Sequence, residues 1–107
     1  MRVELHPEAR AELRSAALWN EVQGPDLGER FLERVHTAIA HIGEYPNAYP
    51  IWPGTRRSQI PIHKAGVEGF PYLIAFEAHM NRLVVLAIAH AKRRPLYWLA
   101  GASRLGA

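Results

Sequence analysis

The stretch RLVVLAIAH, residues 82–90, holds seven consecutive apolar residues, Leu83 to Ala89, and no other feature limits the possible folds as strongly. A strand that is apolar on both sides is buried on both faces, so we expect it at the centre of a sheet. A second strand is predicted at residues 70–78, FPYLIAFEA, and residues 79–81 between the two supply a tight turn. These residues therefore predict a β-hairpin within a larger sheet.

Two helical patterns precede the hairpin. The first is predicted over residues 7–22, opened by a proline in its first turn, and the second over residues 25–42, after the break QGPDLG. The first helix should bury Ala9, Leu13, Ala16, Ala17 and Asn20, with Glu8, Glu12 and Glu21 pointing elsewhere. The second should bury Leu27, Phe31, Val35, Ala38, Ile39 and Ile42. Joined by a short turn, the two helices predict a helical hairpin.

Shorter signals complete the order of elements. Val3 and Leu5 alternate with polar residues, which predicts a short first strand. Residues 43–54 are rich in proline and glycine, so we expect no regular structure there, and Pro61 favours an edge position for a strand at residues 56–63. The order β-α-α-β-β-β predicts an α+β fold in one domain, residues 1–107: an N-terminal strand, a two-helix hairpin on one face, a three-stranded antiparallel sheet and a short C-terminal tail.

Composition excludes several classes of protein. The chain has no cysteine, so disulfides, thiolate zinc sites and a cysteine nucleophile are excluded. The N-terminal residues carry charges and lack an apolar signal segment, and the longest apolar run is too short to span a bilayer. We therefore expect a cytoplasmic protein without a membrane partner.

The charge is distributed unevenly. Residues 1–50 hold five arginines against eight acids, a net −3, whereas residues 51–107 hold eight Lys or Arg against two acids, a net +6. This asymmetry indicates an acidic partner for the second half, either nucleic acid or protein.

Several segments in this order resemble the RelE/ParE superfamily of bacterial toxins. They are EARAELRSAALWNE, LGERFLERVHTAIAHIGEYPNAYP, FPYLIAF and VVLAIAHAKRRPLYW, which together extend from about residue 3 to residue 98. The resemblance implies the toxin of a type II toxin–antitoxin (plasmid stabilisation) system, neutralised by a cognate antitoxin through which it would contact DNA only indirectly. RelE-like members cleave messenger RNA on the ribosome, whereas ParE-like members inhibit DNA gyrase.

RNA cleavage without a metal requires a base for the 2′-hydroxyl, cations for the phosphorane and an acid for the leaving oxygen. If the chain is a nuclease, the resemblance places catalysis on His90, Lys92, Arg93 and Tyr97. One departure weakens this interpretation. RelE-like sequences tend to carry an arginine directly after the aromatic residue of the FPY strand, and here Leu73 follows Tyr72. We therefore favour a ParE-like gyrase inhibitor; the alternatives are a RelE-like ribosome-dependent endoribonuclease and an inactive relative that retains antitoxin binding.

For each remaining candidate residue, a structural interpretation stands beside the functional one. Arg56, Arg57, Lys64 and Arg94 are the predicted nucleic-acid- or partner-binding cations. A neutral His90 would more simply fix the following loop by bonding its backbone, and Tyr97 and Trp98 would anchor the tail. His63 is expected to be exposed, and the aromatic residues between Tyr45 and Trp52 to seal the core. The dispersed histidines predict no metal site, and we expect no cofactor.

Overall fold

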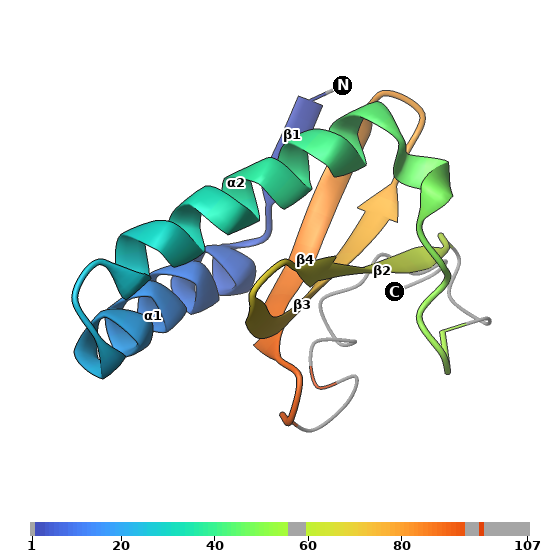
Figure 1. The fold of residues 1–107 in the computed structure, drawn as a ribbon. Coiled ribbons are helices and arrows are strands. Elements are labelled where there is room, and N and C mark those ends of the chain that lie inside the picture. Colours follow the sequence, from blue (N-terminus) through green and yellow to red (C-terminus); the bar gives the residue numbers. More distant parts are fainter. Residues whose placement is uncertain (1, 56–59, 94–96, 98–107) are drawn as a thin grey trace.

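The computed structural model describes residues 2–55, 60–93 and 97. The chain forms the predicted α+β fold, with two helices on one face of a four-stranded sheet (Figure 1). The elements, in chain order, are β1 (Arg2–Leu5), α1 (Pro7–Gln23), α2 (Leu27–Glu44), the 3-10 turn η1 (Pro46–Ala48), β2 (Ile62–Val67), β3 (Phe70–Ala78) and β4 (Arg82–His90). No helix of the described residues is long and apolar enough to cross a membrane.

The sheet has the order β1-β4-β3-β2 and is mixed, because β1 lies parallel to β4 while the other pairs are antiparallel. The apolar run in β4 is central, as predicted from its two apolar faces. Strand β2 is an edge strand, also as predicted, but both of its predicted bounds, residues 56–63, were wrong, and the strand continues to Val67. It begins at Ile62, directly after Pro61, since proline has no N–H to donate to a ladder.

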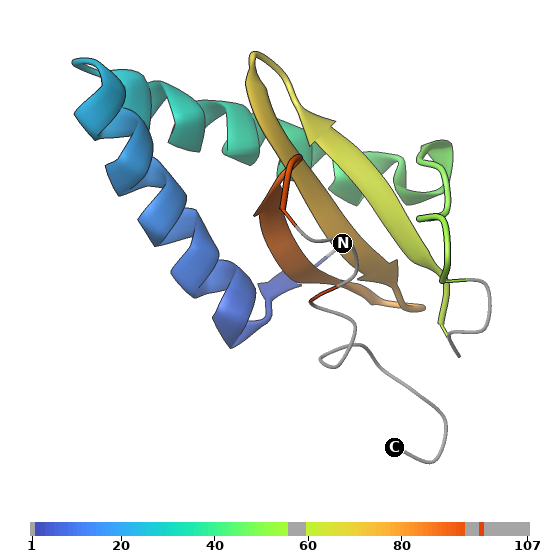
Figure 2. The same cartoon turned by 90° about the horizontal axis from the view of Figure 1, so that it is seen from below.

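The two helices diverge from their connecting turn, which lies beyond the edge of the sheet (Figure 2). Helix α1 buries Ala9, Ala16 and Asn20, and α2 buries Phe31, Val35 and Ile42, each on the predicted face. The predicted end of α2 was two residues short, and η1 adds a turn to a segment expected to be irregular.

Glu21 does not point away from the hairpin, contrary to the sequence-based prediction. Its carboxylate accepts hydrogen bonds from the backbone N–H of Gly28 at 3.0 Å and of Asp26 at 3.2 Å. Asp26, the N-cap residue of α2, makes no side-chain capping bond. The preceding helix therefore supplies the carboxylate that satisfies the exposed N–H groups at the start of α2.

The core lies on both faces of the sheet. On the helix-covered face, Phe31 packs against Phe70 and Tyr72, with ring centroids 5.3 and 4.8 Å apart. On the opposite face, Trp52 belongs to a smaller cluster with Ile62, Ala75, Leu86 and Ala87. Trp52 is buried there, as predicted, whereas Tyr45, which was also expected to seal the core, is 55% exposed.

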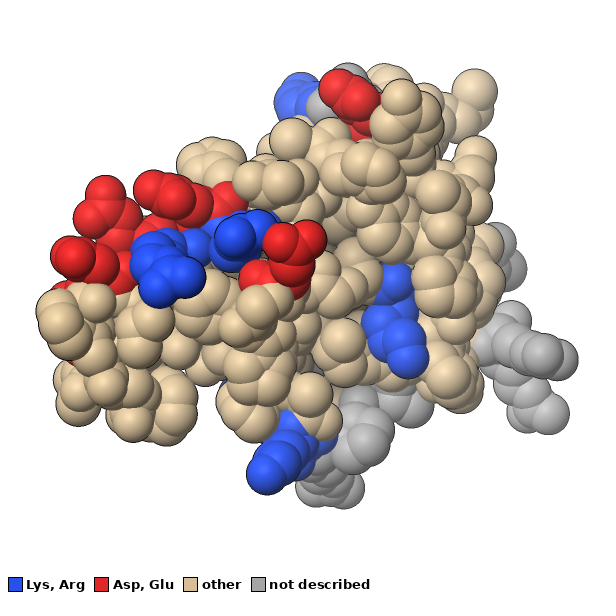
Figure 3. Space-filling model, viewed as in Figure 1, with Lys and Arg blue, Asp and Glu red and all other residues tan. Residues whose placement is uncertain are grey.

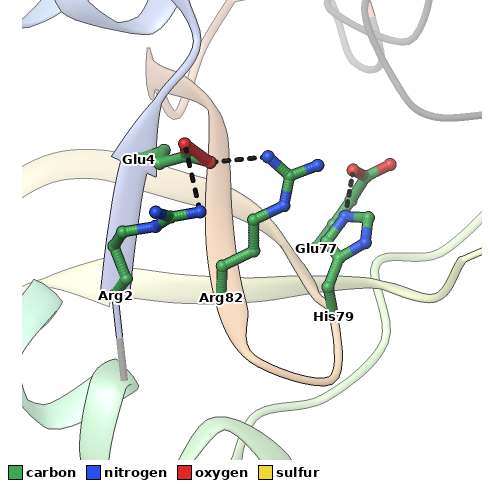
Figure 4. Close-up of polar contacts among 5 residues, drawn as sticks. All are labelled: Arg2, Glu4, Glu77, His79 and Arg82. Atoms are coloured by element: carbon green, nitrogen blue, oxygen red, sulfur yellow. Dashed lines mark hydrogen bonds and ion pairs between the residues drawn. The ribbon is translucent and has the colours of Figure 1, made fainter.

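Polar contacts gather at the sheet end where β4 begins (Figure 4). Arg2 and Arg82 lie opposite each other in the β1–β4 register, and Glu4 pairs with both, at 3.9 and 2.7 Å. Glu77, which is fully buried, bonds His79 Nε2 at 3.2 Å. This charged end is remote from His90, which ends the same strand.

Candidate functional site

His90 ends β4 opposite Tyr72 of β3, and the two rings meet edge to face at 5.2 Å. The backbone N–H of Lys92 donates to His90 Nδ1 at 3.1 Å. In a neutral ring the proton therefore lies on Nε2. His90 fixes the following turn through the backbone, as predicted from its position.

A pocket of about 360 Å³ lies between α1 and the ends of β3 and β4. His90, Tyr72 and Arg93 line it from the sheet side, and Trp19, which is 56% exposed, lines it from α1. The pocket therefore combines an imidazole, a guanidinium and an exposed indole.

Glu12 also lines this pocket, and sequence reasoning missed it by predicting that the side chain points elsewhere. Its Oε1 accepts the backbone N–H of Ile88 at 2.9 Å, and its Oε2 accepts from Arg93 at 3.4 Å and from the Tyr97 hydroxyl. Burial raises the pKa of Glu12, and this effect outweighs the Ile88 N–H and Arg93, which lower it. The available signal in the sequence was weak: Glu12 lies beside Leu13 and one turn before Ala16, at the border of the apolar face.

The residues expected to cleave RNA are brought partly together. Arg93 stacks on Tyr97, with its guanidinium carbon 3.8 Å from the ring centroid, and both side chains bind the Glu12 carboxylate. Lys92 is exposed and does not line the pocket. Leu73 pairs with Ala89 on one side and Gly66 on the other, so these neighbours place no cation beside it.

Of the four predicted partner-binding cations, Lys64 lies within the described residues, and it does not line this pocket. Lys64 pairs with Ala75, a member of the cluster on the opposite face, and its Nζ lies 5.7 Å from the Trp52 ring centroid. Arg56, Arg57 and Arg94, with Trp98, lie outside the described residues. Tyr97 packs against the same opposite-face cluster, in agreement with its predicted role as an anchor.

His63 is buried, contrary to the prediction that it is exposed. Its ring stacks on Phe76 at 5.1 Å, and its Nδ1 lies 2.9 Å from the backbone oxygen of Tyr49. The chain between η1 and β2 covers this side chain, which local sequence does not indicate. Within residues 2–55, 60–93 and 97, no group of three His, Asp or Glu is placed to hold a metal ion.

Within the described part of the chain, two apolar surfaces on the helical half are open to solvent. A groove of about 450 Å³ between β1, α1 and α2 is lined by Val3, Leu5, Leu13, Leu32, Val35, His36 and Ile39. On α1, Leu18, Trp19 and Val22 form an exposed stripe. On the face in Figure 3, acidic side chains gather over the hairpin with Lys or Arg side chains among them, and uncharged side chains cover most of the rest.

Comparison with known proteins identifies relatives of this fold. The family model described as ParE toxin of type II toxin-antitoxin system, parDE, matches residues 3–95. A solved structure titled "Chromosomal ParDE TA system from P. aeruginosa" is similar, with a TM-score of 0.69 and 17% sequence identity, over 86% of this chain and 97% of that chain. No curated protein matches.

Proposed function

Because the chain belongs to the ParE toxin family of type II toxin–antitoxin systems, we propose that it inhibits growth by binding DNA gyrase. A cognate antitoxin neutralises it, and DNA is contacted only through that antitoxin. In this proposal the chain acts as a binding protein and not as a nuclease.

The observation that carries the proposal is the carboxylate placed among the residues a nuclease would need. Arg93 and Tyr97 both bind Glu12. A phosphorane needs cations whose charge is available to it, and a carboxylate at 3.4 Å offsets the charge of Arg93. Among the described residues, no second cation lies at this place in the sheet, because Leu73 is apolar and its partners on the neighbouring strands are Ala89 and Gly66. The site therefore favours recognition of a partner over cleavage of RNA.

The basic half of the chain supplies the proposed contacts with gyrase. Glu12 offsets part of the charge of Arg93, but the Arg93 side chain is 55% exposed, so N–H groups that do not contact Glu12 stay open for hydrogen bonds to a partner. Lys64, on the opposite face, and Arg56, Arg57 and Arg94 remain proposed partner-binding residues on the strength of their charge alone.

The apolar surfaces support the antitoxin partner. Large exposed apolar patches on a small protein commonly mark interaction sites. The groove between β1 and the helices and the stripe of Leu18, Trp19 and Val22 are two such surfaces. In the proposal the antitoxin covers apolar surface on the helical hairpin.

The test is expression of the chain without antitoxin, with DNA damage and translation recorded in parallel in the same cells. We expect a DNA-damage response while translation continues, and co-expression of the antitoxin encoded beside it restores growth. A rapid stop of translation with messages cut in the ribosomal A site would contradict the proposal and favour the RelE-like alternative. Normal growth without antitoxin would also contradict it and favour an inactive relative.

A matched pair of variants tests the surface contacts. Lys64→Ala removes a half-buried cation, so we expect severalfold weaker binding to gyrase. Met80→Ala removes a side chain that is 99% exposed in the β3–β4 turn and carries no charge, so binding should not change. Equal binding of both variants and wild type would exclude Lys64 from the contact.

A further inference from the structure

Glu12 lies where helix α1 passes the open edge of β4. Strand β1 pairs with β4 up to Leu5 and Val85, and the His6 N–H then donates to the Val85 carbonyl at 2.8 Å. Beyond this point the Glu12 carboxylate, and not a β1 residue, accepts the Ile88 N–H. The side chain thus continues the hydrogen bonding of the sheet edge after β1 has ended.

The second carboxylate oxygen holds the chain that follows β4. It binds the Arg93 guanidinium and the Tyr97 hydroxyl, and these two side chains also stack on each other. The Glu12 side chain is 16% exposed and that of Arg93 is 55% exposed. One partly buried carboxylate on α1 therefore binds β4, Arg93 and Tyr97, and much of the guanidinium stays open to solvent.

The charge of Glu12 is not explained by fold stability. Burial raises its pKa, which means that the folded state favours the protonated form more than the unfolded chain does. A neutral glutamine could accept the same Ile88 hydrogen bond. What glutamine lacks is the negative charge that attracts Arg93, so the charge points to a role in the site.

We propose that Glu12 is a positioning residue for the partner-binding site: its negative charge holds Arg93 stacked on Tyr97 beside the His90 pocket, so that the cation meets a partner in one fixed orientation. That this orientation serves binding to gyrase rests on the proposed function, whereas the positioning of Arg93 by Glu12 does not. A side chain held in its bound position loses less entropy when it binds.

The groups that face Glu12 within the described part of the chain make this position sensitive to acid. They are Glu8 on α1, Tyr72 on β3, His90 on β4, and Arg93 and Tyr97 beyond it. Protonation of Glu12 removes the attraction for Arg93, so acid releases the Arg93 side chain.

The first test uses the isolated full chain and does not depend on its target. Glu12→Gln is compared with Glu8→Gln, which removes a carboxylate one turn earlier on the same helix. In Glu12→Gln we expect the Tyr97 ring and Arg93 Nε–H resonances to move to averaged positions, while Ile88 amide exchange changes less than about threefold. In Glu8→Gln these resonances stay in place. Unchanged Tyr97 and Arg93 resonances in Glu12→Gln would overturn the proposal.

Stability separates positioning from a merely structural role. Glu12→Gln should be at least as stable as wild type at neutral pH, because it removes a buried charge. Clear destabilisation beyond that of Glu8→Gln would overturn the positioning role. Glu12→Asp restores the charge on a shorter side chain and should recover part of the shift in the Arg93 resonance, and a spectrum identical to that of Glu12→Gln would count against it.

The second test measures binding to purified gyrase. Glu12→Gln should bind roughly tenfold more weakly, and Glu8→Gln as wild type does. The affinity of wild type should fall with acid more steeply than that of Glu12→Gln. Equal affinities of the three proteins would overturn the role in binding. If wild type does not bind gyrase at all, the proposed function fails, and the resonance measurements still decide whether Glu12 positions Arg93.

Discussion

Gly28, near the start of α2, is the position where the helical hairpin has the least room for a side chain. A Cβ there would lie 2.5 Å from the carbonyl oxygen of Ala17 and 3.1 Å from the Glu21 side chain. The first contact is with backbone, so it cannot be relieved by rotating a side chain. Gly28→Ala therefore has to push α1 and α2 apart and disturb the Glu21 cap.

We expect Gly28→Ala to lower the free energy of unfolding by about 1–3 kcal/mol, the usual cost of overpacking. In a domain of this size each 1 kcal/mol lowers Tm by about 4–8 °C. Urea and thermal unfolding followed by circular dichroism measure both quantities.

Gly43 is the matched control in the same helix. A Cβ there would lie 3.9 Å from Val3 Cγ2, which is an ordinary contact. Gly43→Ala should therefore raise stability by about 0.5 kcal/mol through helix propensity, limited by its place in the last turn. A neutral Gly28→Ala variant would contradict the close approach of the two helices. A change of stability in the same direction in both variants would contradict it as well.

Three further predictions address the core, a surface ion pair and pH. Phe31→Ala should lower the free energy of unfolding by about 3–5 kcal/mol in urea titrations, because Phe31 is fully buried against two aromatic rings. Glu4→Gln should cost less than about 1 kcal/mol, since Glu4 and Arg82 are each about 40% exposed, and a larger loss would contradict this view of the pair. Burial raises the folded-state pKa of Glu12 above the ordinary value of a glutamate, so its contribution to stability is present below that ordinary pKa and is lost as the pH rises through the raised pKa. The free energy of unfolding, measured for both proteins at several pH values, should therefore fall for wild type relative to Glu12→Gln as the pH rises.

The elements that local patterns define were predictable from the sequence. The apolar stripe of α2 predicted which side of that helix is buried, and the two apolar faces of β4 predicted a central strand. Both predictions are confirmed. The start of β2 was misplaced because the predicted segment ran through Pro61, whereas the observed strand begins only after this proline, which has no N–H to donate.

The errors concern single polar side chains whose partners come from elsewhere in the fold. Glu12 binds residues more than seventy positions away, and His63 is covered by the chain around Tyr49. Helical periodicity places each carboxylate on a side of the helix, but it does not tell whether a strand edge or a neighbouring helix end lies there. The sequence therefore pointed to His90, Arg93 and Tyr97, whose roles stay predictions, and it did not point to Glu12, which binds Arg93 and Tyr97.

Supercoiling of relaxed plasmid by purified gyrase, with the full chain added in increasing amounts, tests the central claim most directly. The account predicts inhibition that depends on the concentration of the chain and disappears when the cognate antitoxin is added in equal amount. Normal supercoiling in the presence of excess chain would contradict it.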